Sequence, residues 1–214
     1  MVTARAPLLW AVTALFAAGF AILGSSAASN SFAVDKSALA LRGHATSAAW
    51  ALTVSGFFAT QLLIASAFVI YAWHAQRLRG EAVYALGLLL LVQGFVSLSK
   101  LWFHRLRPEA WLVRHETTYS YPSGHAATAV AFLGVLLMCV WLSSAAKSVR
   151  LAAAALAVVW TAGIAWSRLA LGAHFATDVV GGLLLGAAWL CGTLPLYKRI
   201  ALGFQRVQMP ANHS

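Results

Sequence analysis

Charged residues are scarce in this chain: Asp, Glu, Lys and Arg make up 9% of its 214 residues, whereas 61% are hydrophobic. An average soluble domain is roughly a quarter charged and about half apolar. This shortage of charge, together with a mean hydropathy of +0.79, excludes a disordered or collagen-like chain and argues strongly against an ordinary cytosolic globule.

Acidic residues and cysteines are the rarest of the chemically active types. The five Asp and Glu residues provide no cluster of carboxylates of the kind that holds magnesium. Cys139 and Cys191 both lie in long apolar runs, which argues against a disulfide framework or a zinc site and favours two small buried hydrophobic side chains. We therefore expect no metal and no other cofactor.

Basic residues are in excess, because fifteen Lys and Arg face only five acids and give a formal net charge of +10. In so apolar a chain, this excess is more typical of loops that face anionic headgroups, or of a site for an anionic substrate, than of a nucleic-acid binder. We expect no nucleic-acid partner.

Long apolar stretches dominate the rest of the sequence. A membrane-spanning helix needs about 20 mainly apolar residues, and six stretches qualify or nearly qualify: 8–28, 48–73, 82–101, 125–142, 151–169 and 178–196. They leave only short loops, so residues 1–214 are predicted to form a single integral-membrane domain. The predicted fold class is all-α: a polytopic bundle of six transmembrane helices whose backbone polar groups are all bonded internally.

Three features of these regions allow two interpretations each. The first stretch follows Arg5 as a cleaved signal peptide would, but it is long for one and we favour a retained anchor. The segment Ser29 to Ser47 is either a short amphipathic helix at the membrane interface or a plain loop. Gly182 and Gly186 form a GxxxG spacing, for which close packing within the chain is favoured over dimerisation.

Ionisable residues in or beside membrane helices are costly and usually functional. Three groups of them fall at the same predicted end of the bundle. The first consists of Lys100, Arg107 and Pro108, where the proline ends any helix. Taken alone, its two cations could simply extend to lipid headgroups.

The second group, Pro122-Ser123-Gly124-His125, directly precedes the fourth stretch. Serine is a good N-cap residue, glycine allows close backbone approach, and the free N–H groups of a helix start can bind an anion. A capped helix start with an incidental histidine is the alternative interpretation.

The third group comprises Ser167, Arg168, His174 and Asp178. His174 and Asp178 are four residues apart, so on a helix they share a face. A carboxylate that binds one imidazole nitrogen fixes the tautomer and frees the other nitrogen as a nucleophile, although a purely structural His–Asp hydrogen bond is also possible.

Taken together, the three groups place three cations, a helix start and two histidines at one membrane face. Cations suit a phosphate, because phosphoryl transfer depends mostly on positioning and charge stabilisation. Two histidines suit a two-step route in which one attacks and the other handles the proton of the leaving group. The pattern predicts phosphoryl transfer without a metal.

These groups resemble the three ordered motifs of the type 2 phosphatidic acid phosphatase (PAP2) superfamily. They read KLWFHRLRP at 100–108, PSGH at 122–125 and SRLALGAHFATD at 167–178, complete and in the family's order. The resemblance extends from the third helix to the sixth, a little over half of the chain. It implies a membrane enzyme with six helices, a site on the extracytoplasmic side and no magnesium requirement.

The resemblance also implies a role for each matching residue. His174 would be the nucleophile that forms a phosphohistidine, and Asp178 would orient and polarise it. His125 would protonate the leaving oxygen and then act as base on the hydrolytic water. The phosphoryl oxygens would be held by Lys100, Arg107, Ser123, the Gly124 N–H and Arg168.

The implied substrate is a lipid phosphate in the bilayer, such as phosphatidic acid, phosphatidylglycerophosphate, undecaprenyl diphosphate or a lipid A phosphate. A phosphotransferase that passes the phosphoryl group to a lipid or sugar acceptor would use the same residues. A non-catalytic transporter is disfavoured, because no internal repeat is evident and the polar groups gather at one end.

Four loop residues, Arg105, Arg114, His115 and Glu116, are candidates for headgroup contacts but are expected to be solvated loop charges.

Lysines and arginines in the loops indicate the orientation of the chain in the membrane. With a cytoplasmic N-terminus, eight lie inside and seven outside, which decides nothing. Once Lys100, Arg107 and Arg168 are attributed to phosphate binding, eight inside residues are compared with four outside residues. This supports a multi-pass protein of the cell membrane with its site on the extracytoplasmic side. The sequence does not indicate an oligomeric state.

Overall fold

The computed structural model describes residues 6–30, 32–109 and 116–208, and within these ranges the chain is helical and contains no strand. The predicted all-α class is therefore confirmed. The helices, in chain order, are α1 (Ala6–Ser29), α2 (Ala33–Ala38), the 3-10 helix η2 (Leu39–Leu41), α3 (Thr46–Ser55), α4 (Phe58–His74), α5 (Arg79–Phe103), α6 (Gly124–Leu142), α7 (Lys147–Ala170) and α8 (Ala176–Gln208).

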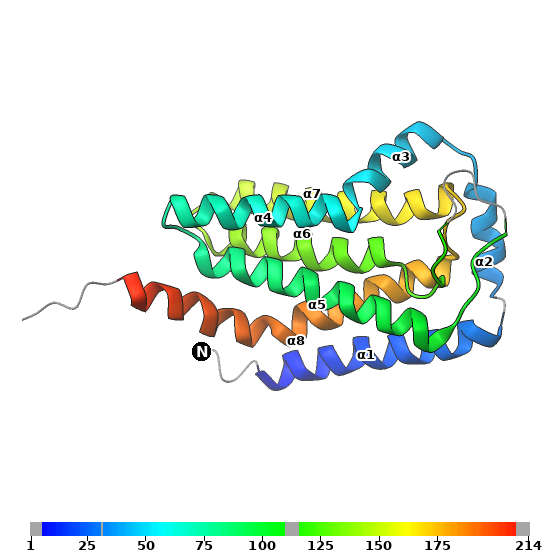
Figure 1. Cartoon of the computed structure of the whole chain (residues 1–214), viewed down its shortest axis with the longest axis horizontal. Helices are drawn as coiled ribbons and strands as arrows, with labels where there is room; N and C mark the ends of the chain where they lie inside the picture. The colour runs from blue at the N-terminus through cyan, green and yellow to red at the C-terminus, as the bar shows by residue number, and fades with distance from the viewer. Residues whose placement is uncertain (1–5, 31, 110–115, 209–214) are drawn as a thin grey trace, which may run out of the picture.

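Five of the described helices, α1, α5, α6, α7 and α8, are long and apolar enough to cross a membrane. The pair α3 and α4 can supply a sixth span. The long helices run roughly side by side along the bundle (Figure 1), and α6 packs against α5, α7 and α8, while α1 lies along α8. The predicted six-helix membrane bundle is confirmed at this level.

The second predicted span is not the continuous helix expected over 48–73. It breaks at Gly56 and Phe57, where α3 and α4 meet at a bend of 43°. A Cβ atom on Gly56 would lie 2.8 Å from Ile164 Cγ2 and 3.1 Å from His125 Cδ2, so the chain passes very close to α6 and α7 there. The break lets α3 lean on α7 while α4 packs on α5.

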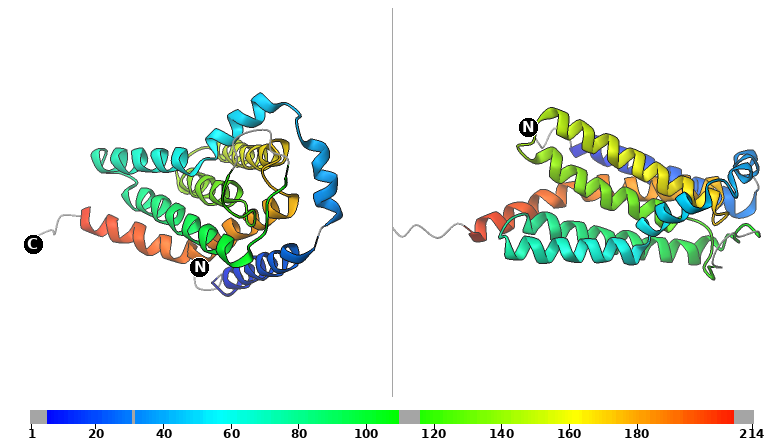
Figure 2. Two further views of the ribbon diagram at one scale, coloured as in Figure 1. Left: turned by 45° about the vertical axis from the view of Figure 1, so that its right-hand side comes forward. Right: turned by 90° about the horizontal axis from the view of Figure 1, so that it is seen from above.

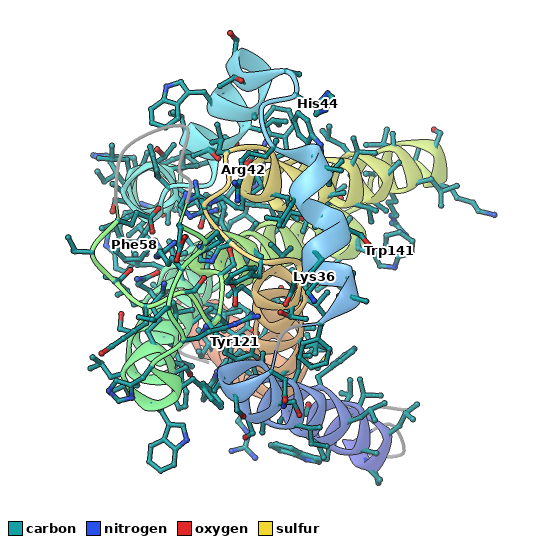
Figure 3. The ribbon with its side chains drawn as sticks, turned by 90° about the vertical axis from the view of Figure 1, so that its right-hand side faces the viewer. Lys36, Arg42, His44, Phe58, Tyr121 and Trp141 are labelled. Atoms are coloured by element: carbon teal, nitrogen blue, oxygen red, sulfur yellow. The ribbon has the colours of Figure 1, made fainter. Side chains whose placement is uncertain are left out.

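The segment Ser29 to Ser47 contains a helix, as one of its two interpretations predicted. Its helix α2 crosses the end of the bundle (Figures 1 and 3), followed at once by η2. Val34 and Leu39 are largely exposed, whereas the one buried residue of α2 is Asp35. A buried acid in a six-residue helix is unusual, because a carboxylate is almost never fully buried unless it is paired.

The two glycines of the GxxxG spacing pack within the chain, as the favoured interpretation predicted. A Cβ atom on Gly182 would lie 2.9 Å from Ala126 Cβ, and one on Gly186 would lie 2.5 Å from the Ala127 carbonyl oxygen. The backbones of α8 and α6 are therefore in direct contact.

The two cysteines, Cys139 of α6 and Cys191 of α8, are both free and half-buried.

We predict that Gly186→Ala destabilises the protein by roughly 1–3 kcal/mol, because the added methyl group overpacks a backbone contact that cannot yield. Gly87→Ala in α5 is the matched control, since no atom lies within 4 Å of its added Cβ. That variant should be neutral or slightly stabilising, because alanine favours helix over glycine. Thermal unfolding in detergent measures both, and equal stability of the two variants would contradict the close α6–α8 contact.

Candidate active site

The three sequence motifs meet at one end of the bundle, the end that α2 crosses and that faces the viewer in Figure 3. Helix α5 brings Lys100 to its last turn, α6 begins at Gly124, α7 ends just after Arg168, and α8 begins just before Asp178. A cavity of about 850 Å³ opens between them. Its lining includes five of the eight predicted site residues: Lys100, Gly124, His125, Arg168 and His174. The other three, Arg107, Ser123 and Asp178, are adjacent to these residues in the chain or contact them.

The turn between α7 and α8 places His174 beside Arg168. The N–H groups of Ala173 and His174 both donate to the Arg168 carbonyl oxygen, at 2.9 and 3.3 Å. The chain can fold back so tightly because Gly172 has φ of 68°, a left-handed conformation that glycine adopts without strain. The serine, arginine, histidine and aspartate of this motif are therefore gathered by one helix end, one turn and one helix start.

His174 and Asp178 form the predicted i, i+4 pair. His174 Nδ1 lies 3.4 Å from Asp178 Oδ2, and the same oxygen accepts hydrogen bonds from Ser120 Oγ at 2.5 Å and from the Phe175 N–H at 2.8 Å. On the other side of the ring, Arg107 Nη1 lies 3.2 Å from His174 Nε2. A guanidinium can only donate, so this geometry places the imidazole proton on Nδ1 and leaves the Nε2 lone pair facing the cations.

The surroundings of His174 keep its imidazole neutral. Burial lowers the pKa of His174 well below its usual value, and the positive charges of Arg107, Lys100 and Arg168 lower it further. A neutral imidazole has a free lone pair at neutral pH and is therefore a competent nucleophile.

Three buried polar atoms at this site have no hydrogen-bond partner among the described residues: Ser123 Oγ, His125 Nε2 and Arg168 Nε. Ser123 occupies the predicted N-cap position of α6, but its side chain does not cap the helix. The ring of His125 packs edge-on against Phe57, with their centroids 5.3 Å apart. Buried polar groups are normally paired, so three such atoms in one place indicate a polar ligand.

The predicted phosphate-binding cations are held by the chain itself. Lys100 Nζ donates to the Tyr119 carbonyl oxygen at 2.5 Å, and Arg107 Nε donates to that of Thr118 at 2.6 Å. Arg168 Nη1 donates to Thr53 Oγ1 at 3.2 Å. These bonds fix the three positive groups before any substrate arrives, as electrostatic preorganisation requires.

The expectation that Glu116 is a solvated loop charge is wrong. Its two carboxylate oxygens accept from Arg107 Nη2 at 2.6 Å and from Arg168 Nη2 at 2.7 Å. Two buried guanidinium groups attract a nearby carboxylate because it compensates both charges. A phosphate bound by these two arginines, as the sequence predicts, would have to compete with Glu116 for them.

The same expectation for Arg105 is also wrong. Its side chain is 7% exposed and bridges two carboxylates, Asp178 and Asp35. The sequence held one signal for this burial: Arg105 and Arg107 are two residues apart in a non-helical segment, so both side chains can point the same way while Leu106 points outward. Arg114 and His115 lie outside the described residues.

Several residues at the site were not predicted from the sequence. Ser120 contacts Asp178, while Trp50, Phe57 and Phe58 add apolar side chains to the lining of the cavity. The described residues of Ser29 to Ser47 do not line it.

Residues 81–201 match the PAP2 superfamily. The chain belongs to this superfamily. Among similar curated proteins is phosphatidylglycerophosphatase B of Bacillus subtilis, 37% identical over 108 residues, which are 46% of this chain and 51% of that protein. Another is an uncharacterized 22.5 kDa protein in the cps region of Klebsiella pneumoniae, 43% identical over 86 residues, which are 39% of this chain and 40% of that protein. The alignments thus span about half or less of these relatives.

A solved structure has the same fold as this PAP2 protein. It is the crystal structure described as the first transmembrane PAP2 type phosphatidylglycerolphosphate phosphatase from Bacillus subtilis, with a TM-score of 0.69 and 22% sequence identity. The match covers 94% of this chain and 98% of that one, so the fold agreement includes helices outside the residues matched by the family.

We predict that Glu116→Gln increases the affinity of the protein for inorganic phosphate by about tenfold. The anion would no longer have to replace two charge-assisted hydrogen bonds, each contributing roughly 1.5–3 kcal/mol. Isothermal titration of the detergent-solubilised protein with phosphate measures the change. Glu109→Gln, at an exposed position in the same loop, is the control and should leave the affinity unchanged. Equal affinity in both variants would show that Glu116 does not compete with the anion.

Proposed function

We propose that this PAP2 protein hydrolyses a phosphomonoester or diphosphate on a membrane lipid, through a phosphohistidine at His174 and without a metal. The observation that carries the proposal is the geometry of His174: its Nε2 lone pair faces buried cations at a cavity, while its Nδ1 side faces the Asp178 carboxylate. Membership of the superfamily and the named activity of the Bacillus subtilis relative support the same conclusion.

In the first proposed step, His174 Nε2 attacks phosphorus and the bond from phosphorus to the lipid oxygen breaks. The electron pair of that bond stays on the leaving oxygen, which takes a proton from His125. The imidazole ring of His174 gains positive charge, which Asp178 stabilises through the Nδ1–H side. Lys100, Arg107 and Arg168 compensate the charge on the phosphoryl oxygens.

In the second step, water attacks the phosphohistidine and gives a proton to His125. The bond between phosphorus and Nε2 breaks, its electrons return to His174, and inorganic phosphate leaves. Ser123 Oγ and the Gly124 N–H complete the set of donors for the phosphoryl oxygens. Both histidines end each cycle in the protonation state in which they began it.

The cavity supports a lipid as the substrate because its lining combines two kinds of side chain. Lys100, Arg168 and the two histidines are polar or charged, whereas Trp50, Phe57, Phe58 and Val96 are apolar. Groups of the first kind suit a phosphorylated headgroup, and those of the second kind suit the start of an acyl or isoprenyl chain. The name of the Bacillus subtilis relative makes phosphatidylglycerophosphate the first lipid to test.

The chain is a multi-pass membrane protein, and we infer that its site faces the extracytoplasmic side of the cell membrane. Arg105 is neutralised by two carboxylates and so leaves the set of outside charges along with the three phosphate-binding cations. In the sequence-based count, eight Lys and Arg assigned to the inside are then compared with three assigned to the outside, which supports this orientation.

We predict that the purified protein in detergent releases inorganic phosphate from phosphatidylglycerophosphate with EDTA present. His174→Ala should lower kcat by about 10³-fold or more, since loss of a nucleophile removes the covalent route. The matched control is His44→Ala, an exposed histidine, which should keep wild-type activity. Full turnover by His174→Ala would refute the mechanism, and phosphate recovered on an added lipid or sugar acceptor would indicate a phosphotransferase.

The direction of the His174 pKa shift predicts the pH dependence. The neutral form attacks, and its pKa lies well below the usual 6.5, so on the acid side activity should fall only as the pH drops through this lower pKa. After correction for ionisation of the substrate phosphate, the acid limb of kcat/KM should therefore have its midpoint below pH 6.5. A midpoint at or above pH 6.5 would contradict a neutral His174 nucleophile.

A further inference from the structure

Asp35 joins the short helix α2 to the back of the candidate site. Its Oδ2 accepts from Arg105 Nη2 at 2.8 Å, and its Oδ1 accepts from the Thr177 N–H at 2.9 Å and from Thr177 Oγ1 at 3.0 Å. Thr177 belongs to the first turn of α8, one residue before Asp178. An aspartate from another part of the chain thus binds a helix start whose N–H groups have no partner within the helix.

Burial sets Asp35 apart from the rest of α2. The Asp35 side chain is 4% exposed, whereas its neighbours Val34, Lys36 and Ser37 are exposed. Packing of apolar side chains therefore does not account for the position of this six-residue helix. Its closest bonds to α8 are those of the carboxylate, so the helix is held where Asp35 reaches Arg105 and Thr177.

Arg105 is shared between two carboxylates, one at each end of its guanidinium fork. Nη2 pairs with Asp35, and Nη1 pairs with Asp178 Oδ1 at 2.5 Å. An arginine with a single carboxylate partner commonly forms two parallel bonds with it, one to each oxygen. Because Asp35 holds Nη2, Arg105 contacts Asp178 through Nη1 and Oδ1, and Oδ2 remains available to Ser120 and His174.

The charges of Asp35, Arg105 and Asp178 also indicate that Asp178 remains available to His174. Asp178 must present negative charge to His174 when the ring becomes positive. A buried arginine paired with Asp178 alone would cancel much of that charge, since Coulomb interactions are strong away from water. The second carboxylate compensates Arg105, so the group of three carries a net charge of −1.

We propose that Asp35 is a positioning residue for the reaction at His174: it holds Arg105 so that Asp178 keeps one oxygen and its negative charge directed at the nucleophile. This inference rests on the proposed function, because it assigns Asp35 a part in that same reaction. Asp35 lies outside the three motifs and does not line the cavity, so it would act only through Arg105 and Asp178.

The test is Asp35→Asn, which keeps the shape of the side chain and removes its charge. We expect kcat for phosphatidylglycerophosphate to fall about tenfold, by analogy with the loss seen when a carboxylate behind a metal-binding histidine is removed, with KM changed less than about twofold. The inhibition constant for orthovanadate, which mimics the five-coordinate transition state at phosphorus, should rise by a similar factor. Lys36→Gln, an exposed charge removal on the same helix, should leave all three quantities unchanged.

The vanadate constant separates positioning from folding, because a smaller fraction of folded protein lowers the apparent kcat without changing an inhibition constant. A lower kcat with an unchanged vanadate constant would therefore overturn the proposal and leave Asp35 a purely structural role, as would wild-type values for both. A double-mutant cycle adds a second measurement. In an Arg105→Met background, Asp35→Asn should have little further effect on the vanadate constant, and a full additional effect would also overturn the proposal.

Failure of the proposed function would give results different from failure of the Asp35 proposal. In that case the wild-type protein would release no phosphate, or His174→Ala would retain full turnover. If the wild type is active, His174→Ala is inactive and Asp35→Asn behaves as wild type, only the role of Asp35 is refuted.

Discussion

The charge balance at one end of a membrane bundle is the constraint on which the rest of this structure depends. Four basic side chains are gathered there, on Lys100, Arg105, Arg107 and Arg168, and three carboxylates bind among them, on Asp35, Glu116 and Asp178. Buried charges are tolerated only when they are paired. Counted over these seven side chains alone, the end keeps one net positive charge, so the pairing holds the fold together and still leaves the site attractive to an anion.

The sequence predicted the elements whose signals are local. Apolar length located the spans, and the spacing of four between His174 and Asp178 placed both on one side of the α8 start. Long-range pairs could not be predicted this way. Asp35 and Arg105 are 70 residues apart, and Arg105 and Asp178 are 73 apart, so no periodicity links them. Their burial follows from the meeting of three helix ends, which only the folded chain defines.

The break at Gly56 and Phe57 shows another limit of sequence reasoning. Hydropathy describes how apolar a stretch is, but it does not show that the backbone bends at the point where it passes close to Ile164 and His125. The same break brings Phe57 against the His125 ring and into the lining of the cavity. A departure from the expected straight span thus supplies part of the apolar lining that the proposed lipid substrate would contact.

The glycine contact between α6 and α8 fixes the relation between the two halves of the site. Gly182 lies in α8, one helical turn after Asp178, and it contacts the first turn of α6. His125 belongs to that first turn of α6. Two main chains that touch leave no layer of side chains to absorb a change in tilt. The separation of the two histidines is therefore a property of the helix crossing itself, and forces that the bilayer exerts on the tilt of either helix act directly on the spacing of His125 and His174.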